Sequence, residues 1–289
     1  MQANDFEELL SVGDFFRYFV SHFQNNIHLG QGCQTIADEA IALICGVLHL
    51  ENAQFENFLP CRLLKRERQA LQEAALKRLN GTPTAYITGE AFLAGYRFFV
   101  SPKTIIPRSF IAELLIEELS PWVLDADAPL ALLDLCTGQG SLAIIAALHF
   151  PNAQIDAVDI SAQALKIAQQ NVDFYGLKNQ ITLIKSNGFE NLNGKKYDLI
   201  LCNPPYVNAK AMAALPREFC NEPKLALAGG KDGLDFVRPL LKNAKKHLNE
   251  NGLLIVEIGH NKEILEKNFN LPFVWVRDDY VFLLNYNDL

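Results

Sequence analysis

The stretch Leu133-Asp-Leu-Cys-Thr-Gly-Gln-Gly-Ser141 decides the fold of this chain. An apolar run typical of a buried strand leads into Gly138 and Gly140, and the residues that follow have the apolar spacing of a helix. Glycines between a strand and a helix let the backbone approach a ligand closely, and the first turn of the helix offers unpaired N–H groups. The motif alone fits a nucleotide ligand or an ordinary tight turn, and Ala143 leaves a dinucleotide fingerprint open.

Strands and helices alternate around this motif. Apolar runs predict strands at 130–136, 154–160, 181–186, 197–203 and 252–258, and amphipathic stretches predict helices at 141–150, 161–175 and 232–248. This alternation is typical of a doubly wound α/β domain, whose mostly parallel sheet has helices on both faces. Residues 273–276 and 280–284 are separated only by a turn, so we expect an antiparallel pair to close the sheet.

Residues 1–82 have the pattern of a small all-α domain. Apolar residues three and four positions apart predict a helix at 36–48, and Thr35 with Asp38 fits a weak capping box. A second helix is expected over 64–79. Its buried face should carry Leu64, Leu71, Ala75 and Leu79.

The period then changes between 84 and 108. Aromatic and β-branched residues interrupted by Gly89 and Gly95 predict a β-hairpin. We therefore expect three parts: a helical domain at 1–82, a hairpin linker at 83–107, and the α/β domain at 108–289.

Composition excludes several classes of function. The 289 residues include 26 Lys and Arg against 33 Asp and Glu, and the net charge of −7 is spread along the chain, so we expect no direct DNA binding. No apolar run approaches the ~20 residues of a membrane span, and the first residues lack the features of a signal peptide, so we expect a cytoplasmic protein without membrane contact. Six cysteines without a CxxC pair indicate reduced, buried thiols and no metal site.

Asp159 ends the second predicted strand, 19 residues after Gly140. At that position an acidic side chain can accept hydrogen bonds from ribose hydroxyls. It can also act simply as a favourable charge at the start of the next helix, beside Ser161. We favour the ribose interpretation because the glycine turn lies upstream.

The motif Asn203-Pro-Pro-Tyr206 directly follows an apolar strand. Two prolines cannot continue a sheet, so the chain must leave the strand rigidly at the carboxyl edge, where ligands bind in such folds. Asn203 and the Pro204 carbonyl are hydrogen-bond acceptors, and Tyr206 supplies an aromatic wall. Together with Pro205 they predict a pocket for a planar –NH₂ group.

These two motifs together resemble those of class I S-adenosylmethionine methyltransferases that act on planar amino groups. The resemblance to the protein-glutamine N(5)-methyltransferases covers nearly the whole chain, including Tyr86-Ile-Thr-Gly89, Pro107-Arg108 and Glu222-Pro223. It implies a Rossmann-like, seven-stranded sheet and S-adenosylmethionine as the methyl donor. The cofactor positions that it implies are Asp134, Cys136, Thr137, Gly138, Gly140, Asp159, Ile160, Asn187, Gly188 and Asn203.

Within this family the chain is most similar to the branch that modifies large-subunit ribosomal protein L-three. Cys136 stands where release-factor enzymes usually have Gly, and Pro107-Arg108-Ser109 replaces their usual Pro-Arg-Pro. The resemblance implies catalysis by Asn203, Pro204 and Tyr206, with Pro205 also at the substrate. Glu222 is expected among the substrate-binding residues, where it orders the loop over the substrate, or it forms a plain salt bridge. Position 187 departs from the family, because Asn replaces the usual acidic residue at adenine and weakens that contact.

Three other functions stay open at this stage. The same chemistry on peptide release factors is the nearest, and it differs only in the protein substrate. Adenine-N6 methylation of nucleic acid uses the same Asn-Pro-Pro-Tyr motif but needs a basic groove, which the sequence does not show. A non-catalytic adaptor that keeps the fold is disfavoured by the intact motif at 203–206.

Overall fold

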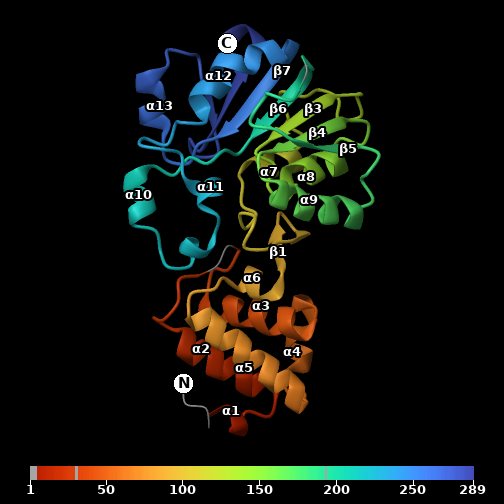
Figure 1. The fold of residues 1–289 in the computed structure, drawn as a ribbon. Helices are drawn as coiled ribbons and strands as arrows, with labels where there is room; N and C mark the ends of the chain where they lie inside the picture. Colours follow the sequence, from red (N-terminus) through yellow and green to blue (C-terminus); the bar gives the residue numbers. More distant parts are fainter. Residues whose placement is uncertain (1–4, 30–31, 193) are drawn as a thin grey trace. The chain divides into compact units, whose positions relative to one another are not determined.

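The computed structural model describes residues 5–29, 32–192 and 194–289, which form two compact units (Figure 1). One unit contains the described residues up to Ala91 together with 216–221, and we call it the helical unit. The other contains those of 92–215 and 222–289, and we call it the sheet unit. The division falls inside the first strand of the chain, β1 (Glu90–Leu93).

The helical unit is built around aromatic side chains. Its helices are α1 (Asp5–Glu8), α2 (Val12–Phe23), α3 (Ile36–Leu48), α4 (Phe55–Phe58), α5 (Lys65–Leu79) and α6 (Thr84–Thr88). Phe15, Phe19 and Phe23 of α2 are fully buried with residues of α3 and α5. The helix predicted at 36–48 is confirmed, and Thr35 and Asp38 form its capping box.

Two predictions for this unit need correction. Leu64 precedes α5 and is 55% exposed, because the helix begins one residue later and buries Leu71, Ala74 and Ala75. The predicted hairpin does not begin at 84, because Thr84–Thr88 forms α6. The hairpin consists only of β1 and β2 (Tyr96–Phe99), with Gly95 in the turn between them.

The sheet unit contains the predicted seven-stranded sheet. Its strands are β3 (Ala131–Leu135), β4 (Gln154–Asp159), β5 (Ile181–Lys185), β6 (Tyr197–Cys202), β7 (Leu248–Glu257), β8 (Val274–Val276) and β9 (Val281–Asn285), in the order β5-β4-β3-β6-β7-β9-β8. The first five are parallel, and β9 runs antiparallel to both β7 and β8. The expected antiparallel C-terminal pair is therefore confirmed.

Alternate residues of the strands point to opposite faces of the sheet and pack into two separate hydrophobic cores. Leu199 and Leu201 of β6 pack with α7 (Ile111–Ile116), α8 (Ser141–His149) and α9 (Ala162–Phe174) on one face. Ile200 and Cys202 pack with α12 (Val237–His247) and α13 (Lys262–Asn268) on the other. Because both faces are covered, the strands read as continuous apolar runs rather than as alternating ones.

Boundary differences have local causes. The helix predicted at 232–248 begins only at Val237, because Gly233 is left-handed and Asp232 accepts hydrogen bonds from Leu234 and Arg238. Strand β7 correspondingly begins at Leu248 rather than at 252. Short connections complete the unit, among them α10 (Ala209–Ala213) and α11 (Lys224–Leu227), which lie between β6 and α12.

All six cysteines are free thiols, but Cys61 and Cys220 are exposed, so the prediction of uniformly buried thiols is wrong for these two. Both lie in short connecting segments rather than in the buried strands that the prediction assumed. Across residues 5–29, 32–192 and 194–289, no helix has the length and apolar character needed to cross a membrane.

Candidate functional site

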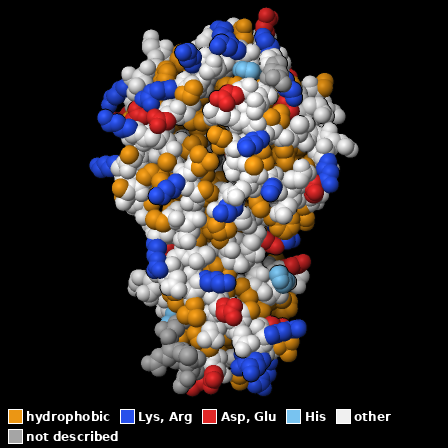
Figure 2. Space-filling view, viewed as in Figure 1, with side chains coloured by type: hydrophobic (Ala, Val, Ile, Leu, Met, Phe, Trp, Pro, Cys, Tyr) orange, Lys and Arg blue, Asp and Glu red, His pale blue; other side chains and the backbone are white. Residues whose placement is uncertain are grey.

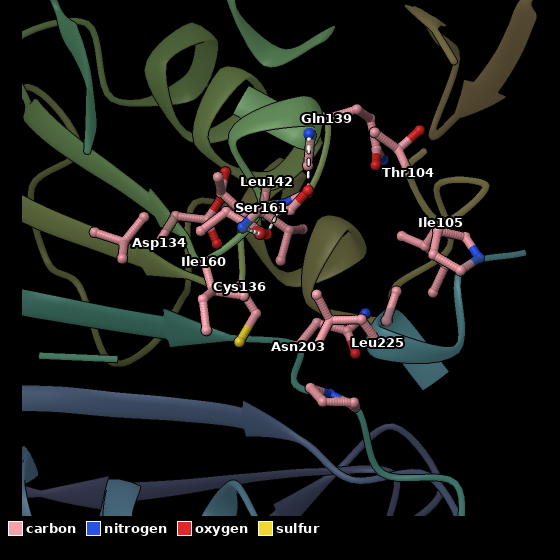
Figure 3. A pocket seen from close by; sticks show the side chains of 18 of the residues that line it. Thr104, Ile105, Asp134, Cys136, Gln139, Leu142, Ile160, Ser161, Asn203 and Leu225 are labelled. Atoms are coloured by element: carbon pink, nitrogen blue, oxygen red, sulfur yellow. Dashed lines mark hydrogen bonds between the residues drawn. The ribbon is translucent and has the colours of Figure 1, made fainter. Parts of the chain in front are cut away.

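A cavity of about 190 Å³ lies in the sheet unit where β3, β4 and β6 end (Figure 3). This is the edge where the strand order reverses, since β3 has β4 on one side and β6 on the other. Most of the sequence-predicted site residues line it: Asp134, Cys136, Thr137, Gly138, Asp159, Ile160, Asn187, Gly188, Asn203 and Pro205. The fold thus brings together residues from four separate loops.

The turn after β3 is held by the buried Asp134. Its Oδ2 accepts a hydrogen bond from the Thr137 hydroxyl at 2.5 Å and from the Ala143 amide at 3.1 Å. Burial raises the pKa of this carboxyl to about 7 against the lowering effect of these two donors. Cys136 adopts a left-handed conformation with φ of 61°, and this places its side chain at the cavity beside Asn203 (Figure 3).

Asp159 joins the ends of β3 and β4. Its Oδ2 accepts from the Gly138 amide at 2.9 Å, and its Oδ1 accepts from the Ser161 amide at 2.7 Å. Burial raises the pKa of the Asp159 carboxyl, while these backbone donors oppose the rise. Asp159 therefore interacts with the start of α9, as one of the two interpretations predicted, and it also lines the cavity.

Asn187 and Gly188 follow β5 and line the same cavity. The Asn187 Nδ2 donates to the Glu190 carboxylate at 2.8 Å, so a neighbouring acidic side chain fixes this amide. Gly188 has a positive φ of 54°. Glu190 itself does not line this cavity.

Asn203 follows β6 and is held by the linker. Its Nδ2 donates to the Arg108 carbonyl at 3.0 Å. This hydrogen bond uses one of the two N–H groups of the amide and fixes the plane of the side chain, so that Oδ1 points away from Arg108. Asn203 therefore presents an oriented acceptor at the cavity.

Glu222 holds that linker from the other side. Its Oε1 accepts from the Arg108 guanidinium at 2.8 Å, and its Oε2 accepts from the Ile106 amide at 3.1 Å. Glu222 is 5% exposed and is not among the cavity-lining residues, and its pair with Arg108 is the salt bridge that the sequence left open as an alternative. Its carboxylate is used to fix the residues that orient Asn203.

Three further predicted residues also lie outside the cavity lining. Gly140 forms the N-cap of α8 and packs against Ala168 of α9. Pro204 is buried, and Tyr206 is half-buried, with its hydroxyl donating to Glu257 at 3.3 Å. Burial and the neighbouring Glu257 raise the pKa of the Tyr206 phenol well above its usual range, so this hydroxyl stays protonated.

Sequence reasoning missed several wall residues that tertiary contacts bring in: Thr104, Ile105, Gln139, Leu142, Leu225 and Phe236. Gln139 stands between the two glycines of the decisive motif, so its position was a usable signal. Thr104 and Ile105 come from the linker, whose pattern predicted only strand. Nothing local marks Leu225, which is 60% exposed beside the cavity.

The cavity has acceptors that suit S-adenosylmethionine. Asp134 Oδ1 and Gln139 Oε1 are buried and have no hydrogen-bond partner within the described ranges, although both residues line the cavity. Unpaired buried acceptors are costly, so a donor such as an ammonium or hydroxyl group is needed to satisfy them. The other wall residues suit the nucleoside part of S-adenosylmethionine. The Asp159 carboxylate can accept hydrogen bonds from hydroxyl groups, and Ile160 and Leu142 offer apolar contacts.

Comparison with known proteins agrees with this geometry. Residues 112–230 match the family model for the methyltransferase small domain. The ribosomal protein uL3 glutamine methyltransferase of Bordetella pertussis is 46% identical over 296 residues, covering 100% of this chain and 99% of that protein. The proteins of the same name from Neisseria gonorrhoeae (43% identical, 98% and 97% covered) and Francisella tularensis (38%, 100% and 94%) match over similar lengths.

The seven-stranded sheet and the cavity at its carboxyl edge define a class I S-adenosylmethionine-dependent methyltransferase. The chain is therefore an enzyme rather than an adaptor. Within this class it belongs to the family of ribosomal protein uL3 glutamine methyltransferases, because relatives of that name align with it over almost its whole length. The family resemblance inferred from the motifs is confirmed.

Proposed function

We propose that this enzyme transfers a methyl group from S-adenosylmethionine to the side-chain amide nitrogen of a glutamine in ribosomal protein uL3. The observation that carries the proposal is the oriented acceptor of Asn203 at the cofactor cavity, with its Nδ2 held by the Arg108 carbonyl. The full-length similarity to enzymes named for this reaction supports the choice of substrate. S-adenosylhomocysteine would be the second product, and no metal takes part.

The chemistry requires control of a weak nucleophile. The lone pair of an amide nitrogen is delocalised into its carbonyl, so the nitrogen attacks only when its geometry is changed. Acceptors that bind both amide hydrogens favour a pyramidal nitrogen and direct electron density toward the methyl group. When bound, S-adenosylmethionine supplies an electrophilic methyl group on a positively charged sulfonium, so positioning does most of the catalytic work.

We assign the two acceptors to the Asn203 Oδ1 and the Pro204 carbonyl. The rigid Pro204-Pro205 pair fixes the separation of these two groups, because proline locks φ. Tyr206 backs this segment rather than lining the cofactor cavity, so we assign it the role of holding the acceptor loop. As the nitrogen bonds to the methyl carbon, one of its protons becomes acidic and is released to solvent to leave the neutral N-methyl amide, so no strong general base is needed before transfer.

We further propose that residues 1–82 recognise the protein substrate, while 108–289 bind the cofactor and carry out the transfer. In the face of the sheet unit drawn in Figure 2, hydrophobic side chains gather around a hollow, and Lys, Arg, Asp and Glu are mixed around them. A surface of this kind fits a protein segment better than a nucleic acid, which would need a continuous basic field. The expected place of action is the cytoplasm, where ribosomal proteins are available.

The test uses purified full-length enzyme with tritiated S-adenosylmethionine and two separate candidate substrates, ribosomal protein uL3 and a peptide release factor. We expect label in uL3, with mass spectrometry placing a single methyl group on a glutamine. Asn203→Ala should abolish the labelling. Faster labelling of the release factor would reassign the substrate, and label on any other residue type would refute glutamine methylation.

A further inference from the structure

A second segment, Glu257-Ile-Gly-His-Asn261, meets Tyr206 from the end of β7. Strands β6 and β7 are parallel neighbours, so their carboxyl ends lie at the same edge of the sheet. Glu257 and Asn261 make hydrogen bonds to Tyr206, and Gly259 packs against its ring. We call these three residues the tyrosine socket.

Glu257 is the charged member of the socket and is only 3% exposed. Its Oε1 accepts from the Tyr206 hydroxyl at 3.3 Å, while its Oε2 accepts from the Ser109 hydroxyl at 2.6 Å and the Phe110 amide at 2.9 Å. Burial raises the pKa of the Glu257 carboxyl, and the donors around it oppose the rise. Since both oxygens are engaged by the chain itself, Glu257 is a positioning residue and not a base for the reaction.

Gly259 allows the ring of Tyr206 to lie directly against the backbone. A Cβ at this position would be 2.7 Å from Tyr206 Cε2, well inside van der Waals contact, and φ is +54°. Gly233 has the same role on the backbone side, because its Cβ would be 2.5 Å from the Tyr206 carbonyl oxygen. Any larger residue at either position would push Tyr206 out of place.

Asn261 completes the socket. It is 5% exposed, and its Nδ2 donates to the Tyr206 carbonyl at 2.8 Å. The hydroxyl, the ring and the backbone of Tyr206 are thus each fixed by a different residue of one five-residue segment. These contacts are more than the single hydrogen-bond partner that a tyrosine hydroxyl needs.

Glu257 also reaches the other support of the acceptor. Ser109 and Phe110, which share its Oε2, directly follow Arg108, whose carbonyl orients Asn203. One carboxylate therefore contacts both ends of the acceptor group, through Tyr206 on one side and the linker on the other. We propose that Glu257, within the tyrosine socket, is the positioning residue that sets the Asn203–Tyr206 loop for methyl transfer.

This inference rests on the proposed function, because it assumes that Tyr206 supports the acceptor. The test compares Glu257→Gln, Tyr206→Phe and the double variant of the full-length enzyme, measuring kcat for uL3 and KM for S-adenosylmethionine. Gln at 257 has a single acceptor oxygen, which cannot serve both Tyr206 and the Ser109–Phe110 pair, and Tyr206→Phe removes the hydroxyl donor, so each single change should lower kcat about tenfold. In the double variant the remaining oxygen serves Ser109 and Phe110 alone, so the double should lose little more than either single change. KM for the cofactor should stay unchanged. Glu117→Gln, which changes an exposed carboxylate paired with Arg277, is the matched control and should behave as wild type.

Multiplicative losses in the double variant would overturn the proposal, because Glu257 would then act independently of Tyr206. A wild-type kcat for Glu257→Gln would do the same. If Asn203→Ala and Tyr206→Phe also kept normal turnover, the proposed site itself would be wrong, and the two failures are thereby distinguished.

Gly259→Ala gives a second test that does not change the carboxylate. It should lower kcat in the wild-type background but have no further effect on Tyr206→Ala, which has no ring to displace. An equal effect in both backgrounds would show that the alanine disturbs only the local backbone and would count against the socket.

Discussion

The two halves of the cavity differ in how their functional groups are held. In the cofactor half, after β3 and β4, carboxylates bind groups of the strand-end turns. Asp134 accepts from Thr137 and Ala143, and Asp159 joins the two turns by accepting from the Gly138 and Ser161 amides. In the acceptor half, after β6, side chains are held by groups far along the chain, as Asn203 is by Arg108. The first half is specified by two neighbouring strand-end turns, and the second depends on a contact between segments 95 positions apart.

This difference teaches where each kind of function is vulnerable. Changes in the cofactor half should appear mainly in cofactor affinity, because the turn itself forms the binding surface. Changes in the acceptor half should appear mainly in kcat, because they disturb groups that act on the transition state. The following predictions test this separation.

The largest effect is expected for Asn203→Ala. Losing the oriented acceptor should lower kcat by about 100-fold or more, as for the removal of a transition-state hydrogen-bonding group. Cofactor affinity, measured by calorimetry, should change little, and Asn268→Ala on the exposed face of α13 is the matched control. A large fall in cofactor affinity with intact turnover at saturation would break the separation of the two halves.

A smaller effect is expected for Asp159→Ala, and it should appear in cofactor affinity rather than in kcat. The carboxylate holds the Gly138 amide and lines the cavity, so cofactor affinity should fall roughly 10- to 100-fold, as for loss of a charge-assisted hydrogen bond. The value of kcat at saturating cofactor should change less. Asp173→Ala, on the exposed side of α9, serves as the control, and unchanged affinity would assign the ribose contact to another residue.

Asp134 makes stability depend on pH. Burial raises its pKa to about 7 in the folded chain, against an unfolded value of about 3.9. A raised folded pKa favours the folded state fully below about pH 4, and this contribution is lost as pH rises toward 7 and above. Relative to Asp134→Asn, which keeps an acceptor for Thr137 and Ala143, the wild type should lose about 1–2 kcal/mol of unfolding free energy between pH 5.5 and 7.5.

Urea unfolding of the two proteins without cofactor, at both pH values, measures this difference. Parallel pH profiles for the wild type and Asp134→Asn would show that Asp134 keeps an ordinary pKa. In that case Asp134 would not make the stability of the cofactor half depend on pH in this range.

The smallest expected effect concerns salt. A net charge of −7 should attract a strongly basic ribosomal protein, so KM for uL3 should rise by about threefold between 50 and 300 mM NaCl, while KM for the cofactor stays constant. The effect is small because acidic and basic side chains are mixed on the face drawn in Figure 2. A salt-independent KM for uL3 would indicate that apolar contacts dominate recognition.

The fold was predictable because its signals are local and repeated. Strand and helix periodicity located β3 to β9 within a few residues, and the turn between 273 and 284 was enough to predict the antiparallel pair. The errors arose where tertiary contacts override local pattern. Thr84–Thr88 is rich in strand-forming residues yet forms α6, which packs against α3 and α5.

The cofactor half of the site was equally predictable from the sequence. Gly138, Asp159 and their neighbours lie at strand ends, and strand ends of a parallel sheet meet at one edge. The residues that hold the acceptor half in place were not predictable from the sequence. A salt bridge was one of the two interpretations of Glu222, but its partners Arg108 and Ile106 were not predictable, because nothing local in the sequence marks residues that pair across more than 110 positions.

The amino-acid sequence by itself therefore determined the class of fold, the strand-end motifs and the family, because each is specified by short-range patterns of apolar residues, glycines and prolines. Tertiary structure alone decided that Tyr206 is held in the socket of Glu257, Gly259 and Asn261, and that Arg108 orients Asn203. The physical reason is that a buried side chain takes whatever hydrogen-bond partner packing brings to it, and packing joins segments that sequence distance keeps apart.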